Sequence, residues 1–172
     1  MLDMIATDYE IKAPVSWFPA GLISWYAPGA VPVALVTSWI ALIGGDEPRI
    51  RTAWHGRHTP LSRLWTGGDF VFNVPSEPDL KTIRDLMKQG KLCLDVATDL
   101  QQTCIEGTSA AAPRLTACPV QLECVGGSLS DSGYDHELQG EVLLLHRGGQ
   151  SIAVDEVTDL CAIQPLSSLS CL

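Results

Sequence analysis

The chain has 172 residues, 46% of them hydrophobic and 18% charged, and a formal net charge of -9. This composition is typical of a globular protein, and the length fits a single domain over residues 1–172. The negative charge argues against nucleic acid or an anionic membrane as a partner. Asp3, Asp8 and Glu10 stand where a secretion signal would be basic and then apolar, so we expect a cytoplasmic protein.

The segment 18–45 contains no charged residue. Prolines interrupt it repeatedly, whereas a membrane-spanning helix needs about 20 unbroken apolar residues. We predict strands at 20–25 and 33–39, joined by a turn, with extended chain up to residue 43. The missing charges favour buried strands, as in a barrel wall or in a sheet that is covered on both faces.

A basic cluster follows in the segment 48–68, which has no acidic residue. Its cations are Arg49, Arg51, His55, Arg57, His58 and Arg63. Thr59 and Pro60 suit the N-cap and the first position of a short helix, which would leave free backbone amides beside the cations. Such a helix start favours a phosphate group. The alternative is a solvated basic strand and turn.

Further strands and one helix are predicted along the rest of the chain. The strands lie at 49–55, 69–74, 121–126 and 138–146. Gly140 marks a bulge or a close backbone approach in the last of them. The helix starts after Ser76 and ends between Lys88 and Gly90. Residues 92–113 show no strand pattern, and only a helical turn is indicated there. About six strands with short helices predict a mainly β fold, a closed or nearly closed barrel.

Cysteine and motif patterns exclude several classes of site. The six cysteines form no C-x-x-C pair and no regular spacing with histidine, so we expect reduced thiols. His55 and His58 are three residues apart, but no nearby residue completes a metal site, and we expect none. Nucleophile-elbow, Walker and G-x-G-x-x-G motifs are absent, which disfavours the enzymes that depend on them.

Several motifs occur in the order and spacing of one known family. They are FPAGLIS at 18–24, VTSW at 36–39, DEP at 46–48, RHT at 57–59, GDFVFNVP at 68–75, CPVQLEC at 118–124, DH at 135–136 and GEV at 140–142. With them the chain resembles the flavin reductase-like FMN-binding family of split barrels, which includes flavoredoxins. The resemblance implies a six-stranded FMN-binding split β-barrel, a homodimer with FMN near the subunit interface, and hydride or electron transfer with NAD(P)H as a donor.

The matched residues suit the three parts of FMN. The candidate cofactor-binding residues are Thr37, Ser38, Trp39, Gly44, Gly45, Arg57, His58 and Thr59. The last three, with the helix start, would bind the phosphate. The hydroxyls at 37 and 38 would bind polar atoms of the ribityl chain and ring. The tryptophan would form a wall for the ring, and the glycine pair would allow close backbone approach. A core tryptophan and an ordinary strand end remain the alternatives.

The resemblance also indicates a catalytic histidine, His136, in a loop between two strands. In the family the corresponding residue lies near the flavin and the nicotinamide donor. An imidazole that titrates near neutral pH can orient a hydride donor or stabilise charge on reduced flavin. The alternative is an exposed loop histidine without a catalytic role.

Two departures from the family pattern bear on function. Val33 stands where the family often has asparagine, and the sequence ends without the aromatic-rich tail of many relatives. Three functions therefore stay open. They are an FMN-dependent oxidoreductase, a flavoprotein electron carrier without direct nicotinamide use, and a split barrel that binds another ligand or has lost flavin-dependent activity.

Overall fold

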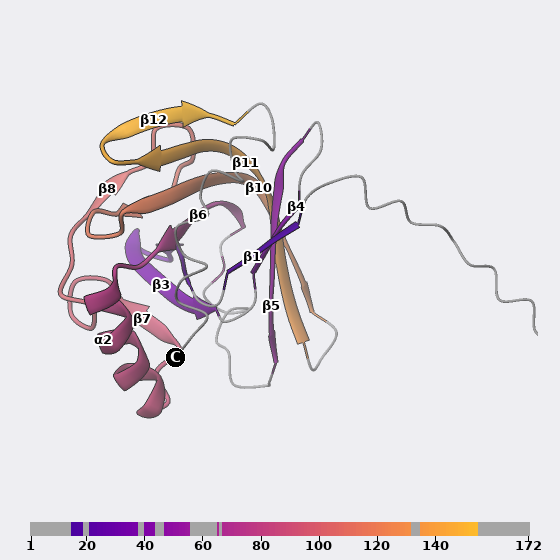
Figure 1. Cartoon of the computed structure of the whole chain (residues 1–172). Helices are drawn as coiled ribbons and strands as arrows, with labels where there is room; N and C mark the ends of the chain where they lie inside the picture. Colours follow the sequence, from indigo (N-terminus) through magenta and orange to yellow (C-terminus); the bar gives the residue numbers. More distant parts are fainter. Residues whose placement is uncertain are drawn as a thin grey trace, which may run out of the picture.

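Figure 1 shows the computed structural model, which describes residues 15–18, 21–37, 40–43, 47–55, 65, 67–131 and 135–154. The described residues form strands and one helix, α2 (Glu77–Lys88). The strands are β1 (Val15–Phe18), β2 (Gly21–Ala27), β3 (Val31–Thr37), β4 (Ile40–Ile43), β5 (Arg49–His55), β6 (Gly68–Val74), β7 (Cys93–Asp95), β8 (Cys104–Glu106), β9 (Pro113–Leu115), β10 (Val120–Asp131), β11 (Asp135–Arg147) and β12 (Gln150–Ala153). None of the described helical residues forms a segment long and apolar enough to cross a membrane.

One antiparallel sheet dominates the molecule. Its strands follow the order β1-β4-β5-β11-β10-β6-β2-β3-β7, and β12 adds to β11. Side chains connect β3 to β5, because the indole Nε1 of Trp54 donates to the Val36 carbonyl at 2.9 Å and the hydroxyls of Thr37 and Thr52 share a hydrogen bond. These contacts close the sheet around its core. The predicted mainly β split barrel is therefore confirmed.

The expected count of six strands is not confirmed. The described residues contain twelve, because short strands extend the sheet at its edges and β8 pairs with β9 as a separate ribbon. Sequence reasoning placed no strand in residues 92–113, where β7, β8 and the start of β9 lie. These strands are three residues long each, too short for a repeating pattern. The indicated turn does occur, held by the Asp95 carboxylate, which accepts from the amides of Ala97 and Thr98.

The core lies inside the sheet, where inward side chains of opposite strands meet. Ile23, Phe72 and Leu122 are among its fully buried members. Strand β5 shows how the residue pattern sets this face, since exposed Arg49 and Arg51 alternate with inward residues. Strand β2, by contrast, is buried on both faces. The prediction that the charge-free segment forms covered strands is thus confirmed.

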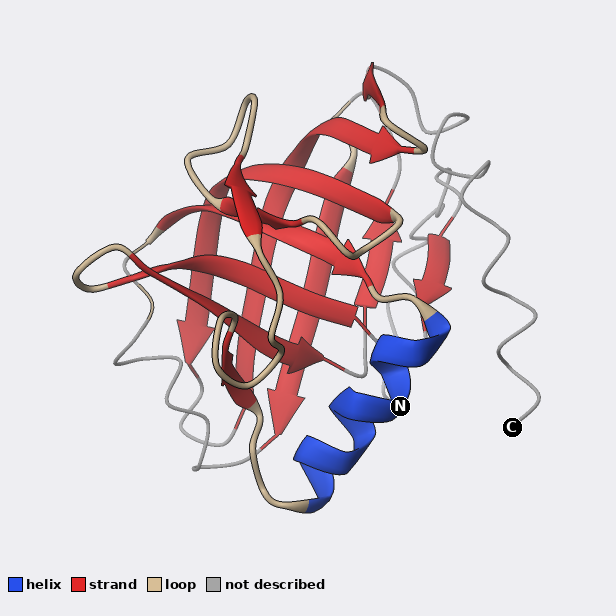
Figure 2. Ribbon diagram, turned by 90° about the vertical axis from the view of Figure 1, so that its left-hand side faces the viewer, coloured by secondary structure: helices blue, strands red, loops and turns tan. Residues whose placement is uncertain are grey.

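Helix α2 covers part of the outer face of the sheet (Figure 2). Ile83 is buried on it and packs with Leu22, Val36 and Leu94. Acidic residues occupy its first turn and Lys88 its last, as the helix dipole favours. The helix predicted after Ser76 is confirmed, although the Ser76 hydroxyl binds the Asp79 carboxylate and makes no capping bond to a backbone amide.

Candidate functional site

Two of the predicted site residues lie within the described part of the chain. Thr37 is the last residue of β3 and is fully buried, and His136 lies on β11. The others lie outside the described residues: Ser38, Trp39, Gly44, Gly45, Arg57, His58 and Thr59. The short helix predicted to start near Pro60 also lies outside them.

The fold brings Thr37 and His136 onto one inward surface. The Thr37 hydroxyl binds that of Thr52, which shares its face of β5 with Trp54 two residues later. Trp54 lies directly opposite His136 in the β5–β11 pairing, so the two side chains share a face of the sheet. We call Thr37, Thr52, Trp54 and His136 the inward cluster. Each of the four is buried, and they come from β3, β5 and β11.

The structure corrects the expected position of His136. It lies on a strand and is 7% exposed, whereas the sequence indicated a loop. The reason is the length of the β10–β11 pairing, which continues to the pair Asp131 and His136. Position 136 therefore belongs to the wall of the barrel. Its side chain shares the inward face with that of Trp54 and is buried there, where a loop residue would meet solvent.

Strand β4 separates two parts of the predicted cofactor site. Its first residue, Ile40, pairs with Thr52 of the inward cluster, and its last, Ile43, pairs with Arg49. Ser38 and Trp39 precede this strand in sequence, and Gly44 and Gly45 follow it. The two predicted segments are therefore separated in sequence by β4, whose ends are about 10 Å apart at the rise of an extended strand.

Sequence reasoning missed Thr52 and Trp54 as site residues. The alternation of exposed arginines with Ile50, Thr52 and Trp54 contains the signal, because it assigns all three to one face of β5. The alternation does not show which strand pairs with β5. The pairing of β5 with β11 connects residues about 80 positions apart in sequence.

The inward cluster offers hydroxyl groups, an indole and an imidazole on one buried surface. Hydroxyls both donate and accept hydrogen bonds, and an aromatic face suits a flat ring system. An imidazole can change its protonation near neutral pH. Within the described ranges, no group of three or more histidine, cysteine or acidic residues could hold a metal ion. Cys93, Cys104, Cys118 and Cys124 are free thiols there, and burial raises the pKa of Cys118 to about 12.

A second polar group lies on the outer face of the sheet, around the fully buried Glu123. Its carboxylate accepts hydrogen bonds from the amides of Thr108, Ser109 and Ala110 at 2.6–2.8 Å and bonds His146 Nε2 at 2.5 Å. Burial opposes ionisation of this carboxyl group, but these donors outweigh it and hold its pKa below the ordinary value. Glu123 therefore fixes the backbone after β8 onto the sheet as a charged carboxylate.

Comparisons with known proteins establish the fold of this chain. No protein-family model matches the sequence, and no curated protein matches it. Among solved structures, the chain shares the flavin reductase-like split-barrel fold. The predicted resemblance is confirmed at this level, since identities below 25% establish the fold alone.

Three solved structures illustrate the likeness. The flavoredoxin of Desulfovibrio vulgaris (Miyazaki F) has a TM-score of 0.62 at 17% identity, over 91% of this chain and 81% of the flavoredoxin. The Streptomyces globisporus C-1027 NADH:FAD oxidoreductase has a TM-score of 0.57 at 16% identity, over 80% of this chain and 75% of the oxidoreductase. The Pseudomonas fluorescens 2-nitrobenzoate 2-nitroreductase has a TM-score of 0.62 at 20% identity, over 75% of this chain but only 64% of the nitroreductase.

Proposed function

We propose that this chain is a flavin-dependent oxidoreductase that binds FMN and accepts a hydride from NADH or NADPH. The observation that carries the proposal is the inward cluster, in which a split-barrel fold brings Thr37 and His136 together although they are 99 positions apart in sequence (136 − 37). The names of the similar structures support it, because they include a flavoredoxin and an NADH:FAD oxidoreductase.

The described residues fit a flavin chemically. The Trp54 indole is a flat apolar surface, and the hydroxyls of Thr37 and Thr52 suit the polar atoms of a ribityl chain and ring. When bound, a flavin would supply reversible acceptance of a hydride. In this proposal His136 holds a proton beside the ring and orients the donor, and the walls of the barrel exclude water.

The predicted residues outside the described ranges complete the proposed site. Arg57, His58 and Thr59 would bind the phosphate through charge-assisted hydrogen bonds. Ser38 and Trp39 would bind the polar and flat parts of the ring system, and Gly44 with Gly45 would admit a close backbone approach. The proposed assembly is a homodimer, which size-exclusion chromatography with light scattering would test.

The first test is FMN affinity. FMN fluorescence, followed during titration with the purified chain, should be quenched by the wild type. Arg57→Ala should weaken binding by about 1.5–3 kcal/mol, roughly 10- to 150-fold, because a charge-assisted phosphate contact is lost. The matched control is Arg49→Ala, since Arg49 is exposed on β5 and pairs with Glu47 at 3.0 Å. Equal loss in both variants, or no binding by the wild type, would contradict the proposal.

The second test is reduction by nicotinamide. Anaerobic stopped-flow absorbance should show bleaching of the bound FMN by NADH or NADPH. His136→Ala should slow this step about 100-fold, the range of acid–base contributions, with little change in FMN affinity. Because His136 is buried, His136→Gln serves as a second variant that keeps most of the side-chain volume. A similar loss of rate in this variant would show that the imidazole itself is needed. An unchanged rate in both variants would remove His136 from the mechanism. Tight FMN binding without bleaching by either nucleotide would indicate an electron carrier.

A further inference from the structure

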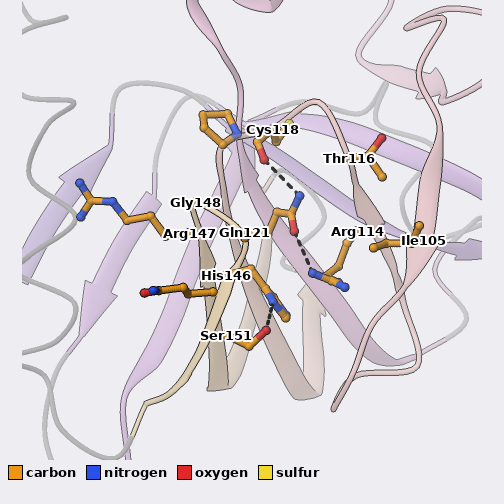
Figure 3. Close-up of a pocket in the computed structure, with 12 residues that line it drawn as sticks. Ile105, Arg114, Thr116, Cys118, Gln121, His146, Arg147, Gly148 and Ser151 are labelled. Atoms are coloured by element: carbon orange, nitrogen blue, oxygen red, sulfur yellow. Dashed lines mark hydrogen bonds between the residues drawn. The ribbon is translucent and has the colours of Figure 1, made fainter.

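A cavity lies on the outer face of the sheet, away from the inward cluster. It has a volume of about 480 Å³ and lies between the β8–β9 ribbon and the β11–β12 hairpin. This volume is within the usual range of small-molecule sites. Side chains of Arg114, Gln121, His146 and Ser151 converge on it from four strands (Figure 3). His146 is ten residues from His136 along β11, so roughly 30 Å of strand separates it from the inward cluster.

Arg114 is the main cation of this cavity, and it forms one ion pair, with Glu123, and one hydrogen bond. The side chain is only 15% exposed. Among the described residues it donates one hydrogen bond, from Nη1 to Gln121 Oε1 at 3.3 Å, and its buried Nε has no hydrogen-bond partner. A guanidinium has several donors and no acceptor, and buried donors in folded proteins are normally satisfied. The buried Nε lies against Glu123, whereas the Nη groups make only this one hydrogen bond and are available to donate to a ligand in the cavity.

Glu123 forms an ion pair with Arg114 but leaves the Nη groups without an acidic partner. Its nearest approach to Arg114 is 3.5 Å, from Oε1 to Nε, because its oxygens already bind three backbone amides and His146. No aspartate or glutamate lines the cavity, although the protein has a net charge of -9. Arg147 also lines it, but its side chain extends away from Arg114 in Figure 3. Because Glu123 offsets part of the charge of Arg114, the lining suits at most a single negative charge on a ligand.

The rest of the lining is suited to a small apolar body. Ile105 and Pro119 supply hydrocarbon surface, and the Gly148–Gly149 turn adds a wall without side chains. The Ser151 hydroxyl, 2.8 Å from His146 Nδ1, adds a polar group near Arg114. A guanidinium binds a carboxylate with two parallel hydrogen bonds. A phosphate dianion would meet stronger repulsion from Glu123, so a carboxylate is the better match.

We propose that this cavity is a second ligand site, which binds a small organic carboxylate through Arg114 and packs its apolar part against Ile105 and Pro119. The site is independent of the proposed flavin site. It would allow the chain to bind an organic acid while the inward cluster remains available.

The test uses 4-fluorobenzoate and its fluorine NMR signal. The full chain should broaden this signal in a saturable way, and the neutral 4-fluorobenzyl alcohol should bind at least about 10-fold more weakly. Arg114→Gln should weaken binding of the carboxylate by a similar factor. Arg49→Gln is the matched control and should bind like the wild type. Equal binding of the acid and the alcohol, or unchanged binding by Arg114→Gln, would overturn the proposal.

A second variant pair covers the case in which Arg114→Gln fails to fold. Ile105 is 48% exposed at the cavity and Ile152 is 40% exposed on β12, outside the lining, so both tolerate a polar side chain. Ile105→Glu should weaken carboxylate binding at least about 5-fold through like-charge repulsion, and Ile152→Glu should not. Equal effects of the two variants would contradict the proposed position.

Competition between FMN and 4-fluorobenzoate tests whether the carboxylate site is separate from the proposed flavin site. Saturating FMN should leave 4-fluorobenzoate binding unchanged, because the two proposed sites are at opposite ends of β11. Displacement of the probe by FMN would place it in the flavin site and overturn the inference. Probe binding by a chain that binds no FMN would refute the proposed function and support the second site.

Discussion

Single residues of this protein acquire their roles from distant partners. Glu123 is the clearest case, because a carboxylate in the middle of a strand is fully buried and still charged. Its amide donors come from residues 108–110 and its imidazole partner from β11. An uncompensated buried charge would be very unfavourable, so these four partners make the position tolerable.

Replacing Glu123 by glutamine should cost about 2–4 kcal/mol of unfolding free energy at pH 7, because a buried charged acceptor is lost. The lowered pKa adds a pH dependence. The Glu123 carboxylate stabilises the folded state fully above pH 4.5, the ordinary pKa of a glutamate. This stabilisation is lost as the pH falls through the lower pKa of the folded state. Urea unfolding at pH 7 and at successive pH values below 4.5 would measure both effects.

The control for this prediction is Glu141→Gln, on the neighbouring strand and only partly buried. It should change stability by less than about 0.5 kcal/mol. Below pH 4.5, the unfolding free energy of Glu123→Gln should fall less steeply with decreasing pH than that of the wild type. Equal slopes for the two proteins would show that Glu123 does not supply this part of the pH dependence.

At the scale of elements, the β10–β11 pair organises the molecule. It contributes to the core, and it carries His136 at one end and His146 at the other. Its register shifts between Val125 and Ser128, opposite Gly140. A Cβ at Gly140 would lie 2.6 Å from Cε1 of Phe70. The close approach expected at this glycine is thus confirmed, whereas the irregularity beside it places the extra residue on β10 and not on β11.

Gly140→Ala should destabilise the protein by about 1–3 kcal/mol, because the added methyl group would overlap the Phe70 ring and crowd the Val125 carbonyl at 3.2 Å. Gln139→Ala is the control, since its side chain is exposed on the same strand. The urea concentrations at half unfolding, compared at an unchanged m-value, would give the stability change of each variant. Equal stability of Gly140→Ala and the wild type would mean that Phe70 moves aside at little cost.

At the scale of the whole molecule, barrel closure separates two polar environments. The contacts of Thr37 with Thr52 and of Trp54 with Val36 join β3 to β5 and enclose the inward cluster. The outer face holds α2, the β8–β9 ribbon and the cavity between that ribbon and the β11–β12 hairpin. One face of the sheet thus carries the proposed redox site and the other a proposed carboxylate site.

Local residue patterns were enough to predict several of the strands and the helix. Strand-length runs of residues indicated β5 at 49–55, uncharged strands indicated β2 and β3, and helical spacing located α2 after Ser76. The order of the family motifs identified the split-barrel fold and included Thr37 and His136 among the candidate residues. These features are readable because they repeat within a few residues of one another.

The contacts between these residues, in contrast, follow from the way the strands pair in three dimensions. The folded structure moved His136 from a loop to a buried strand, added Thr52 and Trp54 beside it, and surrounded Glu123 with four donors. It also formed the cavity at Arg114 from strands that are far apart in sequence. Strand pairing and barrel closure set these contacts, and both depend on long-range packing that no local residue pattern encodes.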